Sequence, residues 1–142
     1  MTATLNLRLR RQVLPTILGL GLAMSLAFAV GAAEKAGNVQ DGEDVFRKCQ
    51  ACHTVGPEAK NRVGPVLNDV IGRKAGTSDG FAYSAGNKKK GEEGLVWTEE
   101  ALFKYLEEPR AFVPGTIMAF AGLKDEQDRL DVIAYLKQFS KK

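Results

Sequence analysis

The chain has 142 residues, a length typical of one domain, and 26% of them are charged. Its 20 lysines and arginines against 17 aspartates and glutamates give a formal net charge of +3. Residues 1–33 hold three arginines and no acidic residue, so residues 34–142 carry 17 charges of each sign and are formally neutral. This neutrality argues against nucleic acid as a partner, and a charged partner would have to be recognised by a local patch.

The first 33 residues have the pattern of a secretory signal peptide. Three arginines within residues 8–11 precede an apolar run over residues 13–30, and small residues follow it. We expect cleavage after Ala33, which leaves residues 34–142 as an exported domain. An uncleaved membrane anchor is the alternative, since the 18 residues of the apolar run are at the lower limit for a span.

The next segment combines a predicted helix with two cysteines. A helix is expected over residues 41–51, with Asp41 as its cap and acidic residues in its first turn. The helix runs into Cys49-Gln50-Ala51-Cys52-His53, and C-x-x-C-H is typical of a c-type haem attachment site. Two thiols at this spacing can each bond to one vinyl group of the same haem. The histidine that follows can then ligate the iron.

Three other uses of these residues compete with haem attachment. A structural zinc site needs four ligands, and the chain has only two cysteines and one histidine. A thioredoxin-like redox pair would need a βαβ pattern beside it, which the sequence does not predict. A disulfide between Cys49 and Cys52 is the remaining alternative, although it would not explain why His53 directly follows the second cysteine.

A long loop is expected in the middle of the chain. Residues 73–94 are rich in glycine, serine, asparagine and lysine and have no helical or strand periodicity. A loop of this length in a compact domain is usually functional. We expect it to wrap a cofactor, with Phe81 and Tyr83 facing inward and residues 88–90 in a solvated turn.

Two further helices are predicted in the second half. The first runs from Glu99 to about Glu107, with Thr98 as its cap and Pro109 beyond its end, and the last begins at Asp125. Their apolar residues at helical spacing are Leu102, Tyr105, Leu106, Val132, Tyr135, Leu136 and Phe139. No segment has a strand pattern. The sequence therefore predicts an all-α domain with long loops, whose small core a haem would complete.

Met118 is the only methionine in residues 34–142. A lone methionine is more often a packing residue. Here it lies in the turn-rich segment 114–118, and the chain has no second histidine, so Met118 is the candidate for the second axial ligand. Ligation by His53 and Met118 would raise the reduction potential and leave no open position, which predicts electron transfer rather than catalysis.

The sequence resembles the class I cytochromes c, the mitochondrial protein and its soluble bacterial relatives, over residues 40–139. The matching stretches are C-Q-A-C-H-T-V (49–55), V-G-P-V-L (63–67), I-G-R-K-A-G (71–76), G-F-A-Y-S (80–84), V-W-T-E-E-A-L (96–102), Y-L-E-E-P (105–109), V-P-G-T-I-M-A-F-A-G (113–122) and V-I-A-Y-L-K (132–137). The resemblance implies the cytochrome c fold, with three main helices, short helical turns and long loops around one covalently attached haem c.

The resemblance also implies roles for individual residues around this haem. The carbonyl of Pro65 would accept a hydrogen bond from the ring of His53, and Tyr105 would donate one to the Met118 sulfur or to a nearby water. Asn87 matches a residue of an internal water network, and Phe120 would lie over the exposed haem edge. The residues that match those holding the buried propionates are Arg73, Tyr83, Trp97 and Thr116.

The partners implied are membrane redox complexes, a cytochrome bc1-type donor and a terminal oxidase or similar acceptor, with no nucleic acid and the chain acting as a monomer. Ala111 and Ile117 stand where the mitochondrial protein has lysines, which points to a bacterial periplasmic carrier. The cations that remain near the expected haem edge are Lys48, Lys60, Arg62 and Lys124. An enzyme such as a peroxidase or nitrite reductase, and a gas-binding module, are alternatives; each needs an open iron position, which Met118 would close.

Overall fold

The computed structural model describes residues 35–141, so the predicted signal peptide, residues 1–33, lies outside the described residues. Five helices form this part of the chain: α1 (Val39–Phe46), α2 (Ala85–Glu92), α3 (Glu99–Glu107), α4 (Pro109–Phe112) and α5 (Glu126–Lys137). Between residues 35 and 141 there is no strand, and the one bridge of extended backbone joins Lys74 and Val96. None of these helices is long and apolar enough to cross a membrane. The all-α prediction is confirmed.

Helix α1 begins and ends earlier than predicted. Its cap is Asn38, whose side-chain oxygen accepts from the backbone N–H groups of Gln40 at 2.8 Å and Asp41 at 3.3 Å. Asp41 lies in the first turn instead, where its negative charge interacts favourably with the helix dipole. The helix ends at Phe46 because residues 47–52 continue as turns, in which the Cys49 N–H donates to the Phe46 carbonyl at 2.7 Å.

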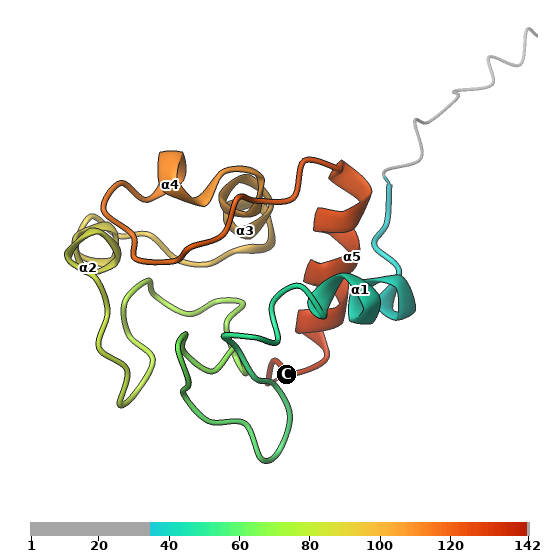
Figure 1. Cartoon of the computed structure of the whole chain (residues 1–142), viewed down its shortest axis with the longest axis horizontal. Helices are drawn as coiled ribbons and strands as arrows, with labels where there is room; N and C mark the ends of the chain where they lie inside the picture. The colour runs from blue at the N-terminus through green and yellow to red at the C-terminus, as the bar shows by residue number, and fades with distance from the viewer. Residues whose placement is uncertain (1–34, 142) are drawn as a thin grey trace, which may run out of the picture. The chain divides into compact units, whose positions relative to one another are not determined.

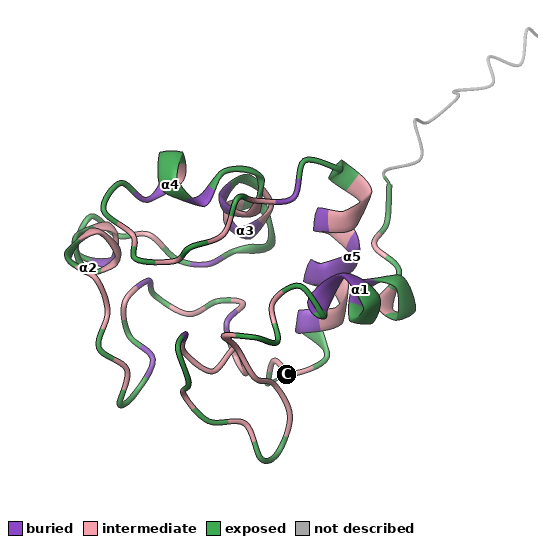
Figure 2. Cartoon of the chain, in the orientation of Figure 1, coloured by how far each residue is buried: buried purple, intermediate pink, exposed green. Residues whose placement is uncertain are grey.

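Helices α1 and α5 cross in direct backbone contact (Figure 1). A Cβ on Gly42 would lie 2.6 Å from the carbonyl carbon of Asp131 and 2.9 Å from the Cβ of Tyr135, so only glycine fits the crossing. Beside it the rings of Phe46 and Tyr135 lie 5.2 Å apart, and Phe46 and Val132 are almost fully buried. The facing sides of the two helices are accordingly buried in Figure 2. Fully burying an apolar side chain of this size stabilises the folded state by about 1.5–3 kcal/mol.

Helix α2 contradicts the prediction of one continuous loop over residues 73–94. The helix has no apolar face, which is why periodicity missed it. Ser84 caps it by accepting from the Asn87 N–H at 3.3 Å. Its glycines make the tertiary contacts: a Cβ on Gly86 would lie 2.9 Å from the carbonyl carbon of Gly115, and Gly91 lies directly against the Ala75 carbonyl. The three lysines at 88–90 are therefore helical rather than in a turn.

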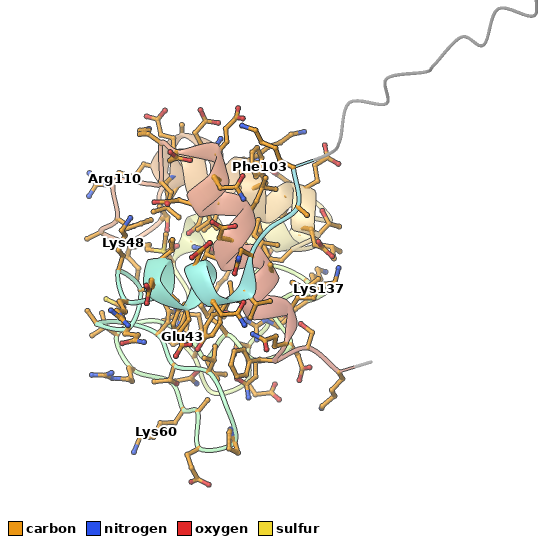
Figure 3. All side chains as sticks on the ribbon, turned by 90° about the vertical axis from the view of Figure 1, so that its right-hand side faces the viewer. Glu43, Lys48, Lys60, Phe103, Arg110 and Lys137 are labelled. Carbon is orange, nitrogen blue, oxygen red and sulfur yellow. The ribbon has the colours of Figure 1, made fainter. Side chains whose placement is uncertain are left out.

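Helices α3 and α5 begin where the sequence predicts. The Thr98 hydroxyl accepts from the Ala101 N–H at 3.0 Å, and Asp125 accepts from the Gln127 N–H at 2.7 Å. Pro109 ends α3 and opens the short α4. Two charged contacts join α3 to α5, an ion pair between Lys137 and Glu99 and the Arg129 guanidinium 4.3 Å from the centre of the Phe103 ring. Phe103 and Lys137 are labelled in Figure 3.

Replacing Gly42 with alanine tests the helix crossing. Alanine gains about 1 kcal/mol in helix propensity over glycine, whereas an overpacked core loses about 1–3 kcal/mol. Because the obstructing atoms are backbone, we expect a net loss of about 1–2 kcal/mol in the free energy of unfolding, measured with urea. Glu43→Ala, at the exposed neighbour on α1, is the matched control and should stay within about 0.5 kcal/mol of the original. A stabilised Gly42→Ala protein would contradict this packing.

Candidate functional site

The turn after α1 holds both cysteines. The N–H groups of Cys52 and His53 donate to the Cys49 carbonyl at 3.0 and 2.9 Å, so a tight turn brings the two thiols and the imidazole together. Both thiols are half-buried and neither is in a disulfide. Burial raises the pKa of the Cys49 thiol to about 11, partly opposed by the charge of Lys48. Cys49 is therefore a neutral thiol at physiological pH, available for bonding to a group placed beside the turn.

Two backbone features orient the imidazole of His53, the Pro65 carbonyl and the side-chain-free position at Gly64. Its Nδ1 lies 2.7 Å from the Pro65 carbonyl oxygen, which can only accept, so Nδ1 carries the proton and Nε2 keeps its lone pair. Burial lowers the pKa of His53, against the opposing effect of this hydrogen bond, and so favours the neutral form that binds metals. The ring lies against Gly64, where a Cβ would come within 2.8 Å of Nδ1 and Nε2. Sequence analysis did not identify Gly64 as part of the site.

Arg73 has a buried donor with no partner. Its two terminal nitrogens donate to the carbonyls of Asn68 and Val66, both at 3.1 Å. Its Nε is buried and makes no hydrogen bond within the described part of the chain. An unpaired buried donor is costly and points to a group that this chain does not itself supply. A carboxylate such as a haem propionate has the acceptor that Arg73 Nε needs.

A second group of predicted residues surrounds Met118. Tyr105 Oη donates to Met118 Sδ at 3.4 Å. The Thr116 hydroxyl oxygen accepts from the Met118 N–H at 3.2 Å and from Asn87 Nδ2 at 3.3 Å, and Asn87 Nδ2 also contacts Ser84 Oγ at 3.3 Å. These bonds tie the Met118 loop to α2 and α3. Thr116 thus braces the Met118 loop from within, and Asn87 binds it from α2.

Aromatic rings pack behind Tyr105. The ring of Trp97 lies 4.7 Å from that of Tyr105, and the Phe112 ring, which sequence analysis did not single out, lies 5.9 Å from Tyr105. Tyr83 packs edge-on against Phe81 at 4.9 Å. Phe120 is half-buried against the core, whereas its neighbour Ile117 is 70% exposed. The rings of Trp97, Tyr105 and Phe112 thus form one aromatic cluster, and its Tyr105 hydroxyl reaches Met118.

The residues present do not make a bare metal site. Within residues 35–141 no three histidine, cysteine, aspartate or glutamate side chains come together. The donor set instead fits haem: two thiols and an oriented imidazole in one turn, a thioether on a braced loop, and an unpaired guanidinium nitrogen.

A groove of about 470 Å³ lies elsewhere, between α3, α5 and residues 35–37. Its lining includes Phe103, Ile133, Glu99 and Lys137, of which Figure 3 labels Phe103 and Lys137. None of the residues predicted for the haem lines this groove, so it is not the cofactor site.

Comparison with known proteins gives the class. The sequence profile of the family described as "Cytochrome c" matches residues 39–140, which is most of the chain. The chain belongs to the cytochrome c family, whose members are electron-transfer proteins rather than enzymes. The family implies haem c bound covalently through two cysteines, and Cys49 and Cys52 are the two that this chain has. The resemblance and the electron-transfer class predicted from the sequence are confirmed.

Within the family, the chain is similar to cytochromes c2. It is 50% identical over 117 residues to cytochrome c2 of Blastochloris viridis, covering 82% of this chain and 87% of that one. It is 55% identical over 105 residues to cytochrome c2 of Rhodomicrobium vannielii, covering 74% and 82%. The solved structure of cytochrome c2 from Rhodospirillum centenum superimposes with a TM-score of 0.71 at 51% identity, covering 74% of this chain and 100% of that one.

Tyr105 gives the site a measurable pH dependence. Burial raises its pKa from 10 to about 12, so the folded protein holds the phenol proton more tightly than the unfolded chain. Its contribution to stability is complete below pH 10 and is lost as the pH rises towards 12. We expect the free energy of unfolding of the reduced holoprotein to fall by roughly 2 kcal/mol across this window. Tyr105→Phe should lack that part of the decline, and an identical decline in both proteins would contradict the assignment.

Proposed function

We propose that this chain is a periplasmic one-electron carrier whose haem iron is ligated by His53 Nε2 and Met118 Sδ. The observation that carries the proposal is that each candidate ligand is held by a hydrogen bond that leaves a ligating lone pair free. His53 gives its Nδ1 proton to Pro65, and the Met118 sulfur accepts from Tyr105 with one lone pair and keeps the other. Met118 is also the only thioether of residues 34–142, and His53 the only histidine of the chain.

The chain's residues would hold the haem from several sides. Cys49 and Cys52 would attach it, and Arg73 Nε would donate to a propionate, with Tyr83 and Trp97 alongside. Thr116 and Asn87 would brace the Met118 loop, and Phe120 would cover the haem edge. The haem supplies the one-electron iron couple. Because two protein ligands leave no open position, the iron would exchange electrons and not bind a substrate.

The proposed location is based on the predicted signal peptide, and the proposed partners are based on the family. Residues 1–33 are proposed to be a signal peptide that is removed after Ala33, which places the domain 34–142 in the periplasm. The partners are proposed to be membrane redox complexes, a bc1-type donor and a terminal oxidase or similar acceptor, which the chain meets as a monomer. The cytochromes c2 named above support this placement, since they are the relatives at about half identity.

Two of the cations expected to face these partners already have partners within the chain. Lys48 Nζ lies 2.8 Å from an Asp128 carboxylate oxygen, and Lys124 Nζ donates to the Glu107 carbonyl at 2.9 Å. Figure 3 shows Lys48 at one edge of the view and Lys137 at the other. With residues 34–142 formally neutral, the attraction to a partner would be local and moderate.

Replacing Met118 with alanine tests the ligand assignment. We expect the haem to stay covalently attached, the reduction potential to fall by on the order of 100 mV, and the reduced iron to bind carbon monoxide. A redox titration and an optical spectrum with carbon monoxide measure both effects. Ile117→Ala, at the exposed neighbour in the same loop, is the control and should keep the potential and refuse the gas. The assignment is wrong if Met118→Ala behaves in the same way as that control.

Opposite substitutions in one ion pair test the docking charge. Lys48→Gln should slow association with an anionic redox partner about twofold to threefold at low salt, because it removes a cation that steers the encounter. Asp128→Asn should quicken association, because it leaves Lys48 without its internal counter-charge. Stopped-flow rates with the native oxidase measure both, and both differences should shrink near physiological salt, where screening acts within about 8 Å. Rates that change in the same direction in the two variants would argue against a role for Lys48.

A further inference from the structure

Asp69 has an unusual backbone conformation. Its φ is +56°, and among the described residues it is the only non-glycine residue with a positive φ. Aspartate tolerates this left-handed conformation better than most residues, but glycine is the usual choice. Unlike glycine, aspartate brings a carboxylate to this turn, and that carboxylate has a partner.

The partner is the backbone after α5. Asp69 Oδ1 accepts from the Lys141 N–H at 2.6 Å, and the Asp69 N–H donates to the Phe139 carbonyl at 3.0 Å. The Lys141 ammonium also lies 3.6 Å from Asp69 Oδ2. That side chain is 91% exposed, so this ion pair contributes little to stability. In Figure 1 the short segment that follows α5 lies beside the loop that follows α1. We refer to these contacts of Asp69 with residues 139–141 as the C-terminal latch.

The other side of the same turn holds the haem-site residues. The carbonyls of Val66 and Asn68 accept from Arg73, and the Pro65 carbonyl accepts from His53. The Asn68 carbonyl and the Asp69 N–H belong to one planar trans peptide group, so they point in opposite directions. The carbonyl accepts from Arg73 and the N–H donates to Phe139, so this single peptide group links Arg73 to the chain after α5.

We propose that Asp69 is a positioning residue for the haem site, which uses the C-terminal latch to hold segment 65–73 so that Arg73 keeps its place. This inference rests on the proposed function, because Arg73 is assigned there to a haem propionate. A guanidinium fixed near the haem disfavours the oxidised state, which has one more positive charge, and so raises the reduction potential. Loosening the C-terminal latch lets Arg73 move away from this position, and the loss of its nearby positive charge lowers the potential.

The test uses two matched pairs of variants in the holoprotein. Asp69→Gly removes the carboxylate and suits the backbone conformation, whereas Asp69→Asn keeps an acceptor at Oδ1. Lys141→Pro removes the backbone N–H that Asp69 binds, whereas Lys141→Ala keeps that N–H and removes only the exposed ammonium. We expect Asp69→Gly and Lys141→Pro to lower the potential, so that the ratio of reduced to oxidised protein at a fixed solution potential falls about threefold. Asp69→Asn and Lys141→Ala should stay near the original.

Two further measurements separate positioning from general stability. Hydrogen exchange at the residue 69 N–H should quicken about tenfold or more in Lys141→Pro, since that N–H is part of the C-terminal latch. In an Arg73→Gln background, Asp69→Gly should produce no further fall in potential, because the effect acts through Arg73. Lower stability in urea with an unchanged potential, or an equal fall with and without Arg73, would overturn the proposal. Failure of the proposed ligation would be visible separately, as carbon monoxide binding by the unmodified reduced protein.

Discussion

The hydrogen bond from His53 to the Pro65 carbonyl is the constraint on which the rest of the site depends. It places the proton on Nδ1 and leaves Nε2 as the ligating atom, while Gly64 lets the ring lie against the backbone. Its acceptor belongs to segment 65–73, so every contact that holds this segment also orients the imidazole. Arg73 binds the segment from within, through the carbonyls of Val66 and Asn68. Asp69 binds it from outside, through the chain end. The proximal side of the proposed haem is therefore held by bonds between side chains and backbone, with Arg73 and Asp69 both fixing the segment that carries the Pro65 carbonyl.

The opposite side is held by side chains and by close backbone contacts. Tyr105 reaches the Met118 sulfur from α3, and Thr116 links the Met118 loop to Asn87 on α2. Helix α2 can approach that loop because Gly86 has no side chain. The two proposed ligands thus lie on separately braced segments, His53 on the turn after α1 and Met118 on the loop before α5. This separation is consistent with a carrier, since a braced pair of ligands changes its geometry little when the iron changes charge.

Several charges of the chain are paired with one another. Lys48 pairs with Asp128, Lys104 with Glu100, and Lys137 with Glu99. Exposed pairs of this kind contribute little to stability, but they reduce the charge that a partner meets. A neutral carrier with a few cations near its haem edge would bind briefly, which suits a protein that must leave one complex to reach the next.

Sequence alone determined the class of this protein, because C-x-x-C-H, a single further thioether and capped amphipathic helices are local patterns that one stretch of chain carries by itself. The helices α3 and α5 were predicted to begin where they do, since Thr98 and Asp125 cap their own neighbours. Tertiary structure decided the rest. Helix α2 has no apolar face and depends on Gly86 and Gly91 meeting distant backbone, and α1 is capped by Asn38, whose own N–H is held by Asp131 at 2.7 Å. Gly64, the unpaired Arg73 Nε and the latch at Asp69 also involve partners far along the chain or outside it. A local pattern cannot predict them, because their energy comes from contacts that exist only after the chain has folded.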